Sequence, residues 1–214
     1  DEEAILAVAD KLNFLGDVSP EARQYARQLE EFLARRKGGA GAGVAEAALA
    51  GKAANISAEI ALAWNLFQEG QLTQEEYSNV THDLTELSFK KMDVPVSLLH
   101  ILQDRDFKNK DKIFNHIAHK SRVPCLALSC FEIQKEVARM LPLEFAARLG
   151  AIAFDRIGEE FMVAVLNPFD LKLQARIREQ LGQPCHFYLV TAAEYDAAMD
   201  AVRKAFKDAE DSPG

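Results

Sequence analysis

The sequence predicts an α+β fold in which a helical N-terminal region precedes a small α/β domain with a short mixed sheet. Two observations lead to this prediction. Apolar residues recur at helical spacing over much of the chain up to residue 121. From residue 122 onward, short apolar runs of strand length alternate with helical segments, which is the pattern of a layered α/β domain. The chain has 214 residues, of which 49% are apolar, enough for one large domain or two small ones.

These patterns divide the chain into five segments. They are an amphipathic helical segment (1–37), a Gly/Ala-rich linker (38–55), a helical subdomain with two degenerate helix-turn-helix segments (56–121), a small α/β domain (122–208) and a tail (209–214).

The first segment carries one apolar stripe. Ser19 is a suitable N-cap, with Pro20 at the first helical position. The stripe that follows includes Tyr25, Leu29, Phe32 and Leu33. It is suited either to packing on its own domain or to docking into a groove of another chain. We expect the Gly/Ala-rich residues after it to form a flexible linker, with at most weak helix over Val44–Leu49.

The helical subdomain shows start and stop signals at regular intervals. Ser57 is the predicted N-cap of its first helix and Gly70 the stop. Thr73 and Glu76 form a capping box for the next helix. Two shorter helices are expected to follow, one starting at Pro95 and one near Asn109.

In the α/β domain the sequence predicts a hairpin and two further strands. Gly158 and Glu159 separate the hairpin strands, and Gly182 stops a helix running through Leu173 and Ile177. The expected strands are 123–128, 151–157, 160–166 and 186–190, and the other expected helices are 133–141 and 194–206.

Composition narrows the class of protein. The formal net charge of −8 argues against a general nucleic-acid binder, which usually carries a basic face. No apolar run approaches the roughly 20 residues that cross a bilayer. The chain opens on Asp1-Glu2-Glu3, whereas a secretory signal opens with positive charge. We therefore expect a cytoplasmic protein that inserts in no membrane.

The motifs of common enzymes are missing. Gly51-Lys52 is followed by Ala53 where a phosphate-binding loop needs Ser or Thr, and Glu46 replaces that loop's first glycine. The sequence contains no GxGxxG, GxSxG or HExxH. We therefore predict no enzymatic activity in this chain, no catalytic residues and no cofactor.

Candidate metal and nucleophile positions have simpler interpretations. His116 and His119 share a spacing that suits two metal ligands, but no third ligand lies nearby, which favours two surface histidines and no metal site. Cys125 and Cys185 lie in apolar, strand-like runs. Together with Cys130 they make an odd number without a CxxC pair, so reduced, buried thiols are the expected state.

One series of motifs resembles a known family. Leu141-Pro142 is followed by the predicted hairpin, then by Asn167-Pro168-Phe169-Asp170, by Gly182 and by Thr191–Glu194 at the start of the last helix. This order is similar to the N-terminal domain of the ATPases that power type II secretion and type IV pilus assembly. The resemblance covers about residues 56–206. Most matched positions suit structural roles: Leu62, Gly70, Leu72, Pro142, Asn167, Pro168 and Asp170.

In one branch of this family, paired helix-turn-helix segments bind cyclic di-GMP through an arginine just before a Leu-Gly pair. Here Ala61 stands at the position of that arginine and Ala63 at that of the glycine. The second segment is expected to align Ser97-Leu98 with the Leu-Gly pair, Ile101 with the next apolar site and Arg105 with the later glycine, with Phe107 closing it. Cyclic di-GMP binding is therefore disfavoured, because the fork-shaped donor is lost at the matched position, although Arg105 and Arg122 are candidate substitutes.

The resemblance implies a non-catalytic docking or regulatory module that links a motor to the cytoplasmic domain of an inner-membrane assembly protein. Two alternatives stay open, namely a receptor for cyclic di-GMP and a standalone adaptor that uses the same fold.

Overall fold

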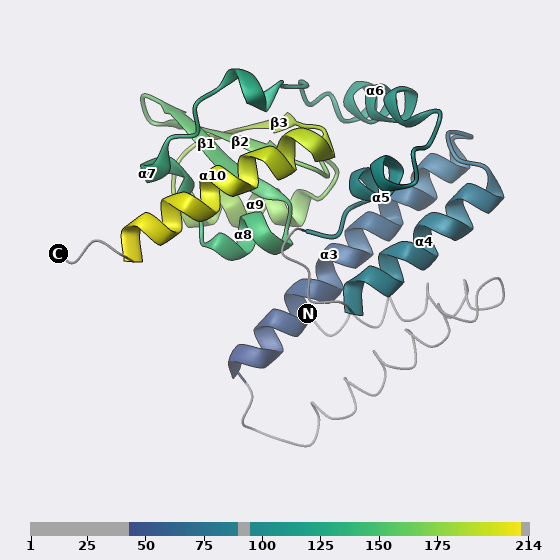
Figure 1. Ribbon diagram of the computed structural model, residues 1–214, viewed down its shortest axis with the longest axis horizontal. Coiled ribbons are helices and arrows are strands. Elements are labelled where there is room, and N and C mark those ends of the chain that lie inside the picture. Colours follow the sequence, from purple (N-terminus) through teal and green to yellow (C-terminus); the bar gives the residue numbers. More distant parts are fainter. Residues whose placement is uncertain (1–42, 90–94, 211–214) are drawn as a thin grey trace. The chain divides into compact units, whose positions relative to one another are not determined.

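The computed structural model describes residues 43–89 and 95–210 (Figure 1). They form two compact units that divide between Lys91 and Met92. Over these residues the chain has eight α-helices, a short 3-10 helix and a three-stranded mixed sheet, which confirms the predicted α+β class. The stripe of Tyr25, Leu29, Phe32 and Leu33, the predicted N-terminal helix around it and most of the tail lie outside the described residues.

In the first unit, two helices form a hairpin, α3 (Gly43–Gln68) and α4 (Gln74–Phe89). Helix α3 runs through Ser57 and through most of the segment for which we expected a flexible linker, so the Ser57 cap is wrong and the linker is helical from Gly43 onward. The physical reason is that alanine has the highest intrinsic helix propensity and dominates this segment.

The turn between α3 and α4 follows the predicted signals. Gly70 has a φ of +67°, a left-handed conformation that favours glycine. The Gln71 N–H donates to the Leu66 carbonyl at 2.8 Å across this turn. The capping box is formed as expected, because the Thr73 N–H donates to the Glu76 carboxylate at 2.8 Å and the Glu76 N–H donates to the Thr73 hydroxyl at 3.2 Å.

The inner side of this hairpin is apolar and aromatic. Leu62, Leu66 and Leu72 are buried. The rings of Trp64 and Phe67 on α3 lie 5.6 Å and 5.2 Å from the ring of Tyr77 on α4, measured between centroids. Aromatic pairs at such distances add to the stability gained from buried area, so this cluster joins the two helices.

The second unit begins earlier than the sequence suggested. We expected the boundary at residues 121/122, yet α5 (Leu98–Asp104) and α6 (Lys110–Ser121) belong to the same compact unit as the sheet. The cause is a tertiary contact that no local pattern reveals, because α5 packs on α10 (Ala192–Glu210), the last helix of the chain.

The sheet contains β1 (Ala151–Ile157), β2 (Glu160–Val165) and β3 (Cys185–Leu189) in the order β1-β2-β3. β1 and β2 form the predicted antiparallel hairpin, and β3 pairs in parallel with β2. The register places Ala151 opposite Val165 and Val163 opposite Phe187.

The strand predicted over Val123–Leu128 is wrong in extent. Only Cys125 forms a bridge, in parallel with Leu189 of β3. Pro124 has no N–H to donate, although its carbonyl accepts from the Leu189 N–H at 2.9 Å, and Leu128 already opens a 3-10 helix, η1 (Leu128–Cys130). This segment therefore lines the outer edge of β3 without extending the sheet by a full strand.

The helix predicted over Ile133–Leu141 is also shorter, because only α7 (Lys135–Ala138) forms. The Gln134 N–H donates to the Phe154 carbonyl of β1 at 3.0 Å, so this backbone group serves the sheet instead of a helix. A second short helix, α8 (Leu143–Arg148), follows Pro142.

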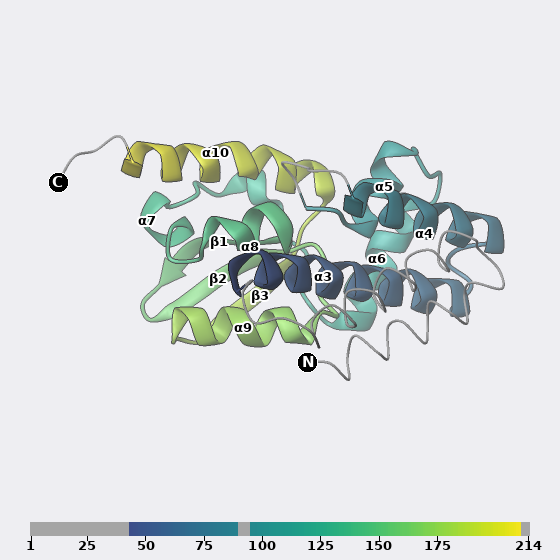
Figure 2. The same ribbon diagram turned by 90° about the horizontal axis from the view of Figure 1, so that it is seen from below.

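Helices lie on both faces of the sheet. Figure 2 shows α9 (Leu171–Leu181) on one side of the strands and α10 on the other. Alternate strand residues contribute to the core on the α9 side. This core consists of Val137, Leu141, Phe145, Leu149, Ala151, Ala153, Phe161, Val163, Val165, Leu173, Ile177, Leu181 and Phe187.

Candidate functional site

The turn from β2 into α9 is held by side chains at the family-pattern positions. The Asn167 side-chain carbonyl accepts from the Phe169 N–H at 3.1 Å, and the Asp170 carboxylate accepts from the Leu173 N–H at 2.9 Å as the N-cap of α9. The Gln174 amide donates to the Pro168 carbonyl at 2.8 Å. These contacts give Asn167 and Asp170 structural roles and fix the start of α9.

The other family-pattern positions also meet structural needs. Leu62 and Leu72 are buried in the first unit, and Gly70 takes the left-handed conformation at its turn. Pro142 is exposed at the start of α8, where its missing N–H costs no helical hydrogen bond.

The two helical hairpins, α3–α4 and α5–α6, share one turn geometry, and their correspondence differs from the expected alignment by one residue. In the second hairpin the Phe107 N–H donates to the Leu102 carbonyl at 3.1 Å, just as Gln71 donates to Leu66 in the first. The left-handed residue is then Asp106, with a φ of +46°, in place of Gly70. Leu102 therefore corresponds to Leu66, and Asp106, not Arg105, replaces the glycine.

This corrected correspondence matches Ala61 with Ser97 and Ala63 with Leu99. Ala63 is completely buried, so its methyl group fills the space that a glycine would leave open. Arg105 and Arg122, the candidate substitutes, are C-caps of α5 and α6, whereas Ser97 is the N-cap of α5. Neither arginine therefore stands at the matched position.

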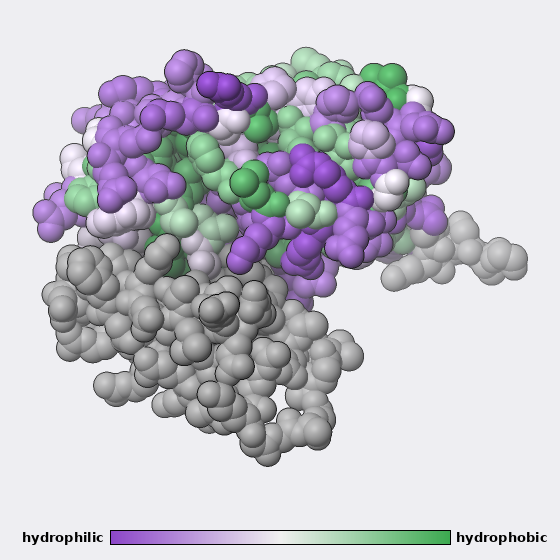
Figure 3. Space-filling view, turned by 180° about the vertical axis from the view of Figure 1, so that it is seen from behind, coloured by the Kyte–Doolittle hydropathy of each residue, from purple (hydrophilic) through white to green (hydrophobic). Residues whose placement is uncertain are grey.

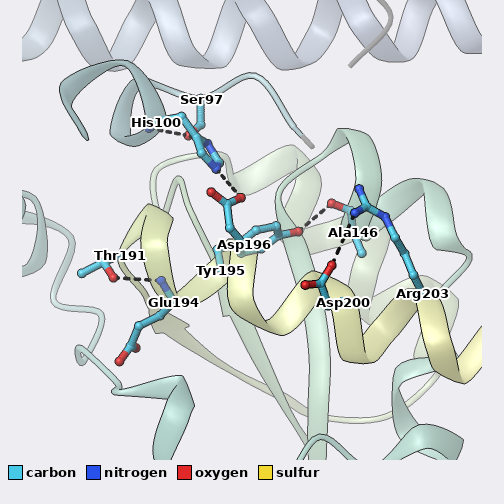
Figure 4. A network of polar contacts seen from close by, with 9 residues as sticks. All are labelled: Ser97, His100, Ala146, Thr191, Glu194, Tyr195, Asp196, Asp200 and Arg203. Carbon is cyan, nitrogen blue, oxygen red and sulfur yellow. Dashed lines mark hydrogen bonds and ion pairs between the residues drawn. The ribbon is translucent and has the colours of Figure 1, made fainter. Parts of the chain in front are cut away.

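Ser97 instead belongs to a buried polar network that the sequence did not predict (Figure 4). Its hydroxyl lies 2.7 Å from His100 Nδ1, and His100 Nε2 lies 3.0 Å from Asp196 Oδ1 on α10. The Ser97 hydroxyl also accepts the His100 N–H at 3.3 Å, as the N-cap of α5. One arrangement satisfies these contacts: the Ser97 hydroxyl donates to His100 Nδ1, and the His100 Nε2–H donates to Asp196.

Serine, histidine and aspartate in contact invite comparison with a hydrolytic triad. Ser97 is only 2% exposed, and its oxygen already accepts a backbone N–H, so no substrate carbonyl can reach it. The network therefore joins α5 to α10 and does not perform catalysis. Only the Ser-x-x-His spacing was visible in the sequence, because Asp196 lies far along the chain.

Three further contacts hold α10 in the second unit. The Tyr195 hydroxyl donates to the Ala146 carbonyl of α8 at 2.7 Å (Figure 4). The Glu194 carboxylate accepts from the Leu128 N–H at 2.6 Å and from the Ser129 hydroxyl at 3.0 Å, which fixes η1. Burial, together with the charge of Asp196, holds the pKa of Tyr195 well above its usual value, so its hydroxyl stays protonated.

The cysteine prediction is partly wrong. Cys125 and Cys130 are exposed and Cys185 is half-buried, because the run around Cys125 follows the edge of the sheet instead of crossing its core. Desolvation raises the pKa of the Cys125 and Cys185 thiols, opposed at Cys185 by the charge of Arg178. Attack by sulfur requires the thiolate, so these shifts lower their reactivity.

Metal ligands do not converge in residues 43–89 and 95–210, where no group of three His, Cys, Asp or Glu side chains has a metal-binding arrangement. His119 is exposed and His116 is half-buried on α6. Across the same ranges, none of the helices has the length and apolar character needed to span a bilayer.

Comparison with known proteins finds a family match in the C-terminal part of the chain. Residues 121–209 match the family model of the MshEN domain. A solved structure of MshE with cdg aligns with a TM-score of 0.45 and 20% identity, covering 66% of this chain and 97% of that one. No curated protein matches the chain. The family match confirms, over residues 121–209, the resemblance to the N-terminal domain of type II secretion and type IV pilus ATPases.

Proposed function

We propose that this chain is a docking module that connects a secretion or pilus motor to the cytoplasmic domain of an inner-membrane assembly protein. The MshEN match over residues 121–209 is the observation that carries the proposal. The matched family is a non-catalytic N-terminal domain of motor ATPases, which supports a role in binding. In this proposal the chain works in the cytoplasm and reaches the inner membrane through its partner.

The architecture of the second unit supports this role. Helix α10 is tied to α5 through His100 and Asp196, to α8 through Tyr195, and to η1 through Glu194. A docking module must present its surface in a fixed geometry, since ordering side chains on binding lowers affinity. Interlocking contacts of this kind meet that requirement.

We further propose that the module works without cyclic di-GMP. The two positions matched to the family's arginine hold Ala61 and Ser97, and neither side chain can replace a guanidinium as a bidentate phosphate donor. Ser97 is moreover engaged with His100. A protein partner is therefore favoured over a nucleotide.

A binding assay tests the docking role. The full chain is immobilised and the cytoplasmic domain of the assembly protein from the same secretion or pilus system is passed over it. We expect saturable binding in the micromolar range or tighter, as is common for transient interfaces. No binding at tens of micromolar would contradict the proposal, with the same domain from an unrelated system as the specificity control.

A further inference from the structure

The turn before α9 and the first residue of the helix place large apolar side chains on the surface. Leu171, its first residue, is 70% exposed, and Phe169, just before it, is 39% exposed. Leu173, Ile177 and Leu181 face the core on the opposite side of the helix. Exposed apolar side chains are common singly, whereas neighbours held on one rigid element indicate a contact surface.

The start of α9 is rigid. The Asn167 side-chain carbonyl accepts from the Phe169 N–H, and the Asp170 carboxylate caps the helix by accepting from the Leu173 N–H. The buried Gln174 amide fixes the Pro168 carbonyl. Phe169 and Leu171 are therefore presented in a set geometry, so little conformational entropy is lost when a partner covers them.

Cations lie on both borders of this apolar surface. The guanidinium carbon of Arg176 is 5.2 Å from the ring centroid of Phe145, and that of Arg178 is 4.7 Å from the ring centroid of Phe187. A guanidinium that stacks on a ring uses its flat face, which leaves its N–H edges for carboxylates. One N–H group of Arg178 also donates to the Gln174 side-chain carbonyl at 3.5 Å. Lys172, also exposed, adds a third cation.

The charge of α9 contrasts with that of the rest of the chain. Lys172, Arg176 and Arg178 stand against a single carboxylate, Glu179, within the helix, whereas the whole chain has a net charge of −8. Helix α10, on the other side of the sheet, has more acidic than basic residues. Figure 3 shows the molecule from the side opposite to that of Figure 1, where hydrophilic residues border hydrophobic ones.

We propose that the outward face of α9, formed by Phe169, Leu171, Lys172, Arg176 and Arg178, docks an acidic amphipathic segment of a protein partner. This inference rests on the proposed docking function and names the surface that performs it. An apolar residue of the partner covers Leu171 and Phe169, while flanking carboxylates pair with the cations. Glu179 would repel a continuous anionic surface such as a membrane, whereas a protein segment can place its carboxylates away from it.

The test is a titration of the full chain with the cytoplasmic domain named above, using wild type and three variants. Lys172→Glu/Arg176→Glu reverses two charges on α9, and Leu171→Ser removes the apolar contact. Lys204→Glu/Lys207→Glu makes the same change in net charge on exposed residues of α10. We expect at least about tenfold weaker binding for the α9 charge variant, about tenfold weaker binding for Leu171→Ser, and less than about twofold change for the control.

The outcomes separate this inference from the proposed function. If both α9 variants bind as tightly as the wild type, the proposed α9 surface is overturned and the docking function stays intact. A wild type that does not bind overturns both. A separate titration uses vesicles with 30 mol% phosphatidylglycerol. If the chain binds these vesicles through α9 and does not bind the protein domain, the proposal of a protein partner is overturned. Leu171→Ser keeps the test decisive if the charge variant loses stability, because an exposed leucine contributes little to folding.

Discussion

The hairpins α3–α4 and α5–α6 form the same backbone turn with different residues. Both close with a left-handed residue and with an N–H donated back to an equivalent leucine carbonyl, Leu66 in one and Leu102 in the other. The first hairpin uses glycine and a complete capping box, while the second uses Asp106 and an N-cap residue, Asn109, whose side chain makes no cap hydrogen bond.

The second hairpin compensates through a tertiary contact. His100 reaches Asp196 on α10, and at the equivalent position of the first hairpin Trp64 belongs to the local aromatic cluster. One hairpin is thus closed by local contacts and the other is held by the α/β layer. The backbone turn is retained while the side chains around it serve different purposes, so turn geometry alone identifies no ligand site.

The largest effect should come from breaking the tie between α5 and α10. His100→Ala removes a side chain that is 10% exposed, leaves a cavity and deprives Ser97 and Asp196 of their partner. We expect a loss of about 2–4 kcal/mol in unfolding free energy, measured by urea unfolding followed by circular dichroism. The exposed His119→Ala serves as control, and equal losses in the two variants would contradict the tie.

The next largest effect concerns the left-handed residues. A Cβ at Gly70 meets nothing within 4 Å, so Gly70→Ala should cost only the backbone penalty of about 1–2 kcal/mol. Fluorescence of Trp64, the single tryptophan, reports this change. Asp106→Gly should stabilise the second hairpin at high salt, where the exposed Asp106–Lys110 ion pair is screened. A higher unfolding free energy for Gly70→Ala than for the wild type would contradict this explanation.

A smaller effect distinguishes the two N-caps. Thr73→Ala removes one half of the capping box and should cost about 1 kcal/mol. Asn109→Ala should cost clearly less, because the Asn109 side chain makes no cap hydrogen bond. Urea midpoints of the two variants, measured side by side, check the difference, and equal costs would show that the capping box contributes nothing special.

The smallest effect is expected at Tyr77, whose buried hydroxyl has no hydrogen-bond partner within the part of the chain that the structure describes, and whose equivalent in the second hairpin is Ile113. Tyr77→Phe should change stability by less than about 0.5 kcal/mol near pH 7, since no hydrogen bond is lost. Burial raises the pKa of Tyr77 to about 12, above its usual 10. The stability linked to this group is therefore complete below pH 10 and is lost as the pH rises toward 12.

The variant should consequently lose less stability than wild type between pH 10 and pH 12, as measured by Trp64 fluorescence in urea. Tyr195 also has a raised pKa, and its hydroxyl donates to the Ala146 carbonyl. Tyr195→Phe should therefore cost about 1–2 kcal/mol at neutral pH, which makes it the matched contrast. An identical alkaline profile for wild type and Tyr77→Phe would contradict the assignment.

Local signals were predicted well from the sequence because they depend on neighbouring residues. Gly70, the Thr73–Glu76 box, the β1–β2 hairpin and the Asn167–Asp170 turn each formed as expected. The predictions failed where residues far apart in the chain decide the outcome. The Phe154 carbonyl accepts the Gln134 N–H, so the helix predicted over Ile133–Leu141 is shorter than expected. The contact between His100 and Asp196 joins α5 to α10, so the domain boundary lies earlier in the chain than predicted.

The candidate site shows the same division. The turn before α9 was visible in the sequence as a motif. The positions of the cations beside the apolar surface of α9 are set by stacking on Phe145 and Phe187, which belong to other elements. The alignment of the second helix-turn-helix segment was wrong by one residue, because a left-handed aspartate leaves no glycine to mark the turn. Backbone conformation, not residue type, identified the correspondence.

The choice between a protein partner and a nucleotide is tested most directly by calorimetric titration of the full chain. One titration uses the cytoplasmic domain of the assembly protein, and the other uses cyclic di-GMP at concentrations up to the millimolar range. We expect saturable heat from the protein and none from the nucleotide, because Ala61 and Ser97 replace the phosphate-binding donors. Saturable binding of cyclic di-GMP without binding of the protein domain would contradict the account.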